Sequence, residues 1–364
     1  MAPRNDNAFE LLRCNLATTD QKQDTANGET QGKRREGKSV RRYFLDTVLC
    51  LLAGAMLSGY AHAQSEVRLS YLGTAGWEIT NGKTVILVDP YLSRLKMVTP
   101  GDAVLAGDPR RTFTLDDVAV SDKAVIDAHI KRADFILLTH THIDHVLDMP
   151  YIAQKTGAMV IGTESTINFA RASGVPDSQL MIVRGGDDLA FGAFSVRIIP
   201  SLHGFLRHGP NISRFPIPPP STIFPADAKS PFRMRDLLIE GGTLAYLIRL
   251  GGVQVLVFGS MNYIEREVDG LRPDVAIIGA SAERREIYRY TPRLLRALGY
   301  PRLVLPTHWD RFNVPYSASQ QPAIQRVQSF LAEVKAASPK TQVIVPKYFE
   351  PIVVKAQDRA EHRK

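Results

Sequence analysis

The chain of 364 residues contains 44% hydrophobic and 23% charged residues and carries a formal net charge of +8. This balance is typical of a globular protein with a sizeable core and excludes a chain that is disordered throughout. Beyond residue 63 the basic residues form no run interleaved with aromatic side chains, so we expect no nucleic-acid partner.

Residues 1–63 differ in character from the rest of the chain. A polar stretch precedes "SVRRYFLDTVLCLLAGAMLSGYAHAQ", residues 39–64, which contains a basic pair, an apolar run and an A-x-A sequence ending at Ala63. This order is typical of a signal peptide cleaved after Ala63. A retained anchor is the alternative, but the apolar run is shorter than the ~20 residues that a membrane span needs. We therefore expect a periplasmic protein without a stable membrane anchor after cleavage.

The export route has two alternatives. "RRYFL" resembles a twin-arginine signal, although Asp46 stands where a basic residue is usual, and the general secretory route is the other possibility. Both cysteines, Cys14 and Cys50, lie in this segment. Residues 64–364 therefore offer no thiolate, and a metal there would be bound by histidine and carboxylate side chains.

Short apolar strands alternate with helical patterns after residue 63. A strand pair is predicted at 67–80 and 83–90, around a turn at Asn81-Gly82. Further strands are expected at 133–140, 159–162, 180–183, 194–204, 243–250, 253–259, 274–280, 302–308, 342–345 and 351–355, with helices near 163–173, 291–298 and 319–337. The alternation predicts an α/β protein, and β-rich halves before and after residue 205 suggest two sheets with helices outside.

Two long intervals, residues 91–132 and 204–242, interrupt this pattern. Loops of this length in a compact fold are commonly functional, so we interpret both as lid-like insertions that select the substrate. The second contains "RFPIPPPSTIFP" (214–225), whose Phe215 and Phe224 could roof a pocket. A plain surface excursion is the alternative.

The sequence "LLTHTHIDHVLDMP" (137–150) places three of the nine histidines and an aspartate within six positions. His140 and His142 lie two apart at the end of a predicted strand, so their side chains leave the same face. Asp144 and His145 follow where the loop turns into a helix. Imidazoles crowded in this way favour a cation that gathers them, and we predict a metal site here.

The H-x-H-x-D-H pattern after a buried strand resembles the metallo-β-lactamase superfamily. The resemblance extends from about residue 67 to about residue 350 and includes "VILVDP" with Asp89, "PSLHG" with His203 and "LPTHWD" with His308. The sequences "DPYLSR" and "PTHWDRF" are similar to the UlaG-like and phospholipase D-like branch. This resemblance implies a four-layer αββα sandwich over residues 64–364 and a metal-dependent hydrolase.

The resemblance also implies two sets of three metal ligands. The first set is His140, His142 and His203, and the second set is Asp144, His145 and His308. Nitrogen and oxygen ligands suit Zn²⁺, with Mn²⁺ or Fe²⁺ as alternatives. Asp89 is expected either to support a ligand histidine from behind or to be a simple turn residue.

One position departs from the superfamily pattern. Many members have an aspartate that bridges both metals after the strand corresponding to "VLVFG", and Ser260 stands there in this chain. The alternatives are two metals, one tightly bound metal, or a metal-binding protein without catalysis. Of the other histidines, His129 is expected on a surface helix, and His208 in a solvated loop or a pocket.

The reaction implied is hydrolysis of an ester, lactone or phosphodiester bond in a small-molecule substrate. Metal-bound hydroxide would attack directly, with Asp144 and His142 as catalytic residues that hold the metals and orient the water. A β-lactam-hydrolysing enzyme is the alternative, although "PSLHGF" around His203 differs from the sequence expected of that group. The patterns predict no oligomeric state.

Overall fold

Two seven-stranded sheets form the centre of the part of the chain that the computed structural model describes, residues 66–97, 105–204 and 218–356. The first sheet has the order β16-β1-β2-β3-β6-β7-β8. Its strands are β1 (Glu66–Gly73), β2 (Gly76–Thr80), β3 (Val85–Val88), β6 (Phe135–Leu137), β7 (Met159–Gly162), β8 (Leu180–Ile182) and β16 (Pro351–Lys355).

The second sheet has the order β15-β14-β13-β12-β11-β10-β9. Its strands are β9 (Asp188–Ala190), β10 (Phe194–Ser201), β11 (Thr243–Leu250), β12 (Val253–Phe258), β13 (Val275–Gly279), β14 (Leu303–Thr307) and β15 (Gln342–Val343). In both sheets antiparallel strands on one side give way to parallel strands on the other. A separate pair joins β4 (Lys96–Met97) to β5 (Thr112–Phe113).

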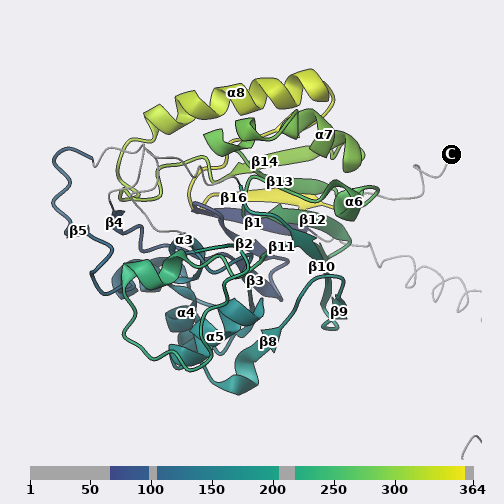
Figure 1. The fold of residues 1–364 in the computed structure, drawn as a ribbon. Coiled ribbons are helices and arrows are strands. Elements are labelled where there is room, and N and C mark those ends of the chain that lie inside the picture. The colour runs from purple at the N-terminus through teal and green to yellow at the C-terminus, as the bar shows by residue number, and fades with distance from the viewer. Residues whose placement is uncertain (1–65, 98–104, 205–217, 357–364) are drawn as a thin grey trace, which may run out of the picture. The chain divides into compact units, whose positions relative to one another are not determined.

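Helices cover the outer faces of the sheets. Figure 1 shows α4 and α5 on one side of the sheets and α7 and α8 on the other, which confirms the predicted four-layer αββα order. The helices are α2 (Lys123–His129), α3 (Ile143–Val146), α4 (Met149–Thr156), α5 (Glu164–Ala172), α6 (Glu265–Val268), α7 (Tyr290–Ala297) and α8 (Gln321–Ala337), with short 3₁₀ turns η1 (Asp177–Gln179), η2 (Met234–Leu238) and η3 (Ala282–Glu286).

The spacing of apolar residues decides which face each helix buries. In α8, Ala323, Val327, Phe330 and Val334 recur every three or four residues and are all buried. They join the core that fills the space between the sheets and under α7 and α8. A second apolar cluster lies between the first sheet and α4 and α5. Among the described residues, no helix combines the length and hydrophobicity needed to cross a membrane.

Two strand predictions were wrong in detail. Residues 67–80 form a hairpin of two strands rather than one, because the backbone reverses at Gly73 and Thr74, which both have positive φ. The division near residue 205 was also misplaced. Strand β10 already belongs to the second sheet, where it pairs with β11 from Phe194 to Ser201, and β16 returns to the first sheet. Sheet membership follows pairing partners, which position along the chain does not reveal.

The two intervals proposed as lids contain ordered structure. Residues 91–132 include β4, β5 and α2. In the second interval, the Phe224 ring is buried against Phe169 and Phe232, with centroids 5.6 and 5.2 Å away, so it belongs to the outer core and does not roof a pocket. Phe215, His208 and the whole signal segment through Ala63 lie outside the described residues, and their roles stay predictions.

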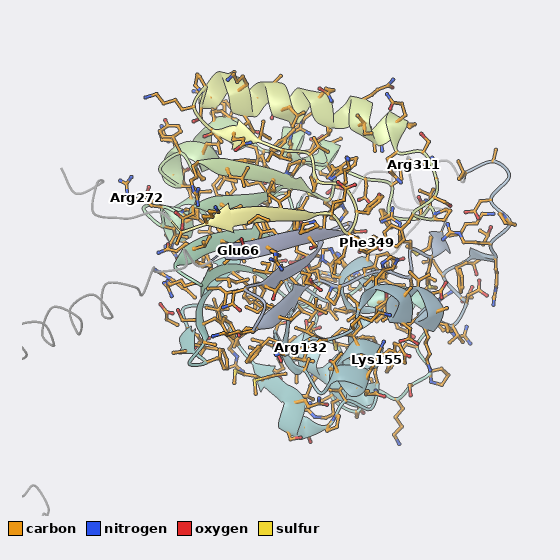
Figure 2. The ribbon with its side chains drawn as sticks, turned by 180° about the vertical axis from the view of Figure 1, so that it is seen from behind. Glu66, Arg132, Lys155, Arg272, Arg311 and Phe349 are labelled. Atoms are coloured by element: carbon orange, nitrogen blue, oxygen red, sulfur yellow. The ribbon has the colours of Figure 1, made fainter. Side chains whose placement is uncertain are left out.

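His129 occupies the surface helix position predicted for it. It is the last residue of α2 and is exposed. Its ring stacks on Phe349, labelled in Figure 2, with centroids 3.6 Å apart. His129 therefore has a packing role at the surface.

Candidate metal centre

The carboxyl ends of three strands supply the candidate ligands. His140 follows β6, His203 follows β10 and His308 follows β14. His142 is the residue before α3, whose first turn contains Asp144 and whose last turn contains His145. Carboxyl ends of strands are where α/β proteins commonly place their sites, because the loops that leave them converge there.

The structure brings all six side chains together in the two sets that the resemblance implies. Within each set, one nitrogen or oxygen atom per residue lies within 4.8 Å of the others: His140, His142 and His203 in the first, and Asp144, His145 and His308 in the second. The sets are neighbours, since the rings of His140 and His145 have centroids 3.9 Å apart. Residues up to 168 positions apart in sequence, His140 and His308, thus meet at one site.

Hydrogen bonds determine which nitrogen faces inward in two rings of the first set. The Thr139 hydroxyl donates to Asp89 Oδ2 at 2.6 Å, so it can only accept from His140 Nδ1 at 3.1 Å. His203 Nδ1 donates to the Gly204 carbonyl at 2.8 Å. These contacts occupy the outer nitrogens of His140 and His203 and direct their unprotonated nitrogens toward the site.

Two nitrogens of the first set lie close together on the inner side. His140 Nε2 and His142 Nδ1 are 3.1 Å apart. Because His140 Nδ1 already donates its proton to Thr139, His140 Nε2 has a free lone pair that points at this contact. A cation could coordinate both nitrogens from this side, and the donor set thus fits a metal.

Asp89 connects the two sets from behind. Its carboxylate is fully buried and accepts from His145 Nδ1 at 2.8 Å and from the Thr139 backbone N–H at 2.8 Å. Through the Thr139 hydroxyl it also supports His140. This is the geometry expected of a carboxylate that orients ligand histidines, rather than that of a simple turn residue.

The second set contains an ion pair. Asp144 Oδ2 lies 3.2 Å from His308 Nε2 and 3.7 Å from His145 Nε2. Burial would raise the pKa of Asp144, but the charges of His145 and His308 hold it well below its usual range. Burial would likewise lower the pKa of His308, but the hydrogen bond and charge of Asp144 raise it to about 9.

In the first set the pKa values of all three histidines are lowered, whereas that of His308 is raised. Burial, followed by the charge of neighbouring imidazoles, lowers the pKa of His140 well below 6.5 and that of His142 to about 3. Burial also lowers the pKa of His203, although the Gly204 carbonyl and the nearby carboxylates of Glu240 and Glu283 oppose it. These three imidazoles are therefore neutral at pH 7, which is the form that binds metal.

Ser260 does not reach across the site as a bridging aspartate would. Its side chain is buried, and its hydroxyl accepts from the Gly204 backbone N–H at 2.8 Å. Ser260 thus holds the loop that carries His203. The side of the site opposite His140 and His145 is open, because His142, Asp144, His203 and His308 are only partly buried.

Some residues around the site were not singled out from the sequence. Glu283 in η3 lies so close to Gly204 that a side chain at that glycine would press on its carboxylate. Arg94 and Asp310 form a buried ion pair of 2.8 Å beside the His308 loop. The signal for this pair was present in "DPYLSR" and "PTHWDRF", two sequences that contain these residues.

Comparison with known proteins agrees with this geometry. A family model described as "Beta-lactamase superfamily domain" matches residues 84–309. A UPF0173 metal-dependent hydrolase of Symbiobacterium thermophilum is 23% identical over 288 residues, covering 77% of this chain and 96% of that protein. One from Carboxydothermus hydrogenoformans is 28% identical over 138 residues, and this match spans only 48% of its length and 38% of this chain.

Solved structures with similar folds have lower sequence identity. Igni18, a metallo hydrolase from Ignicoccus hospitalis, is 16% identical with a TM-score of 0.48, and the match covers 80% of this chain and 100% of that one. CmlA, a diiron β-hydroxylase from Streptomyces venezuelae, is 19% identical with a TM-score of 0.47, covering 80% of this chain and 54% of that one.

Proposed function

The chain belongs to the metallo-β-lactamase superfamily as a metal-dependent hydrolase, and we propose that it uses two metal ions to cleave an ester, lactone or phosphodiester bond. The observation that carries this proposal is the pair of donor sets. Six side chains converge, and the nitrogen that faces away from the site is engaged in three of them: in His140 by Thr139, in His145 by Asp89 and in His203 by the Gly204 carbonyl.

Zinc is the metal that we propose for both sets. The donors are imidazole nitrogens with one carboxylate, a combination that suits Zn²⁺, while Mn²⁺ or Fe²⁺ would favour more oxygen ligands. When bound, such a metal lowers the pKa of a coordinated water and polarises the bond under attack. His140, His142 and His203 would hold one ion, and Asp144, His145 and His308 the other.

Several residues of the site have roles besides metal binding. The Asp144 carboxylate, 14% exposed, reaches the open side of the site and can accept a hydrogen bond from a water placed there. Asp89 keeps the His145 ring in the orientation that presents Nε2 to the site. The partly exposed His142 and His203 border the space where a small substrate would enter.

Turnover by metal-loaded protein tests this function. Purified protein reconstituted with Zn²⁺ should hydrolyse at least one member of a panel of phosphodiester, lactone, simple ester and β-lactam substrates. The matched control is His142→Ala, which should hydrolyse none. Activity confined to β-lactams would favour the alternative function, and metal binding without turnover of any class would favour a non-catalytic metal-binding protein, the role that Ser260 raises.

We also propose that the protein is exported to the periplasm and cleaved after Ala63. The support is the order of basic pair, short apolar run and A-x-A sequence within residues 39–64. Intact-mass measurement of protein from its native cells should give a chain that begins at or near Gln64. A mass that retains residues 45–63 would contradict this proposal.

A further inference from the structure

A short segment after β3 contacts both chain segments that carry the second set. We call residues 89–94, Asp89-Pro90-Tyr91-Leu92-Ser93-Arg94, the strap. Its first residue supports His145, as described above. Its Leu92 and Ser93 backbone N–H groups donate to Asp148 Oδ2 at 2.7 and 2.8 Å, and the Ser93 hydroxyl donates to Oδ1 at 2.5 Å. Asp148 lies just beyond α3, so these bonds tie the strap to the helix that carries Asp144 and His145.

Arg94 joins the strap to the loop after His308. Its side chain is 1% exposed, and every nitrogen of the guanidinium has a partner. Nη1 donates to Asp310 Oδ2 at 2.8 Å, Nε to the Val314 carbonyl at 2.7 Å, and Nη2 to the Arg311 carbonyl. The guanidinium fork thus binds three points of one loop, a geometry that a lysine ammonium cannot reproduce.

The space that Arg94 occupies depends on a glycine. Gly73 has φ of +96°, and a side chain there would collide with Arg94 Nη1. Burial would raise the pKa of Asp310, but the charge of Arg94 and the hydroxyl of Tyr348 lower it below its ordinary value. The pair is therefore ionised at neutral pH inside the protein, where each charge needs the other.

Asp310 transmits this support to His308 through Thr74. Asp310 Oδ1 accepts from the Thr74 backbone N–H at 3.0 Å and from the Tyr71 hydroxyl at 2.9 Å. The Thr74 carbonyl in turn accepts from the His308 backbone N–H at 2.6 Å. His308 has φ of +53°, a left-handed conformation that a histidine keeps only where surrounding contacts hold it.

We propose that Arg94 is a positioning residue for the second metal: by binding Asp310 and the 311–314 loop, it keeps His308 in the backbone conformation that presents its ring to Asp144. This inference rests on the proposed two-metal function. Arg94 and Asp310 contact the loop after His308 and residues 71–74 rather than the first set, to which the strap is linked at its other end, through Asp89 and Thr139. Loss of Arg94 should therefore weaken the second metal and spare the first.

The variant to test is Arg94→Lys, which keeps the positive charge beside Asp310 but loses the fork. Zn²⁺ affinity is measured by stepwise titration of metal-free protein against a chromophoric chelator, with folding checked by circular dichroism. We expect the first equivalent to bind as in the unaltered protein and the second to bind roughly 10–100-fold more weakly, the range typical of residues that orient ligands.

Arg284→Lys is the matched control. The Arg284 side chain is likewise buried, at 2% exposed, and its guanidinium forms an ion pair of 2.8 Å with Glu333. This partner lies on α8. The Arg284→Lys substitution should lower the melting temperature while leaving the affinity for both Zn²⁺ equivalents unchanged. Asp310→Asn, which keeps an oxygen for Thr74 and Tyr71, should weaken the second equivalent as Arg94→Lys does. The double variant should bind the second Zn²⁺ equivalent no more weakly than either single variant, because the two residues act as one unit.

The possible failures are distinguishable. If unaltered protein binds fewer than two Zn²⁺ ions, the two-metal function fails and the role of Arg94 fails with it. If two ions bind but folded Arg94→Lys keeps the second equivalent, or weakens both equally, only the inference about Arg94 is overturned. If Arg94→Lys does not fold, unchanged affinity for the second Zn²⁺ equivalent in Asp310→Asn overturns the inference about Arg94.

Discussion

The two sets of candidate ligands differ in charge and in how they are held. The first set consists of three imidazoles whose pKa values are all lowered, with supports that come mostly from adjacent residues such as Thr139 and Gly204. The second set contains Asp144, and although burial would lower the pKa of His308, the hydrogen bond and charge of Asp144 raise it to about 9. Its supports reach across the chain, from Asp89 to His145 and from Arg94 through Asp310 to the His308 loop.

This difference predicts unequal metal affinity. In the metal-free protein the first set consists of neutral imidazoles, so a cation can bind them without breaking an ion pair. The second set already satisfies its charges in the ion pair between Asp144 and His308, which a metal must displace. We therefore expect the first set to bind the tighter metal.

Removal of a ligand from each set should have the largest effect. His142→Ala should lose the tighter metal and His308→Ala the weaker one, each with a drop in hydrolysis of more than about 100-fold, beyond the range typical of residues that only support a ligand. Metal analysis, rates and circular-dichroism melts on both variants check this, with His129→Ala as the control that retains metal and activity. Near-normal rates in His308→Ala would mean that the second set is not catalytic.

Asp89→Asn should weaken both sets, because this carboxylate supports His145 directly and His140 through Thr139. We expect each Zn²⁺ affinity to fall by roughly 10–100-fold. Asparagine tolerates the positive φ of Asp89, 42°, so the backbone should be retained. Chelator titration measures the effect. If only one equivalent weakened, Asp89 would not connect the two sets.

Ser260→Asp should strengthen the weaker metal by adding an anion beside it. An aspartate here can still accept from the Gly204 N–H that Ser260 now binds. We expect tighter binding of the second equivalent, on the order of tenfold or ~1.4 kcal/mol. Occupancy under mild chelation is the measurement, with Ser260→Asn as the uncharged control. Equal effects of the two substitutions would exclude a role for the added charge.

The smallest expected effect is the pH dependence of the metal-free protein. Since the pKa values of His140, His142 and His203 lie below 6.5 in the folded state, the unfolded chain takes up more protons as the pH falls below 6.5, and stability decreases. His308, with its pKa raised to about 9, contributes stability below 6.5 that is lost as the pH rises through 9. Thermal melts should therefore show a lower midpoint at pH 5 than at pH 7. In His308→Ala the alkaline decrease should be smaller, and a midpoint that rises toward pH 5 would contradict the neutral first set.

Local sequence patterns determined much of this protein. Strands β7, β11 and β16 have the bounds predicted from their apolar runs, and α5 ends before Gly174 as expected. The H-x-H-x-D-H spacing predicted a cluster at residues 140–145 because two residues along a strand return a side chain to the same face. These features depend on a few neighbouring residues, and the sequence displays them directly.

Tertiary structure alone decided the contacts between distant residues. Arg94 and Asp310 are separated by 216 positions, and neither lies in a pattern that names its partner. Phe224 lies in a Pro-rich segment whose composition suggested a pocket roof, yet it packs against Phe169 and Phe232 in the outer core. Ser260 marks a missing carboxylate in the sequence, while only the structure shows that its hydroxyl holds Gly204. Such contacts follow from the order in which strands pair, because that order decides which loops meet at the carboxyl ends of the sheets.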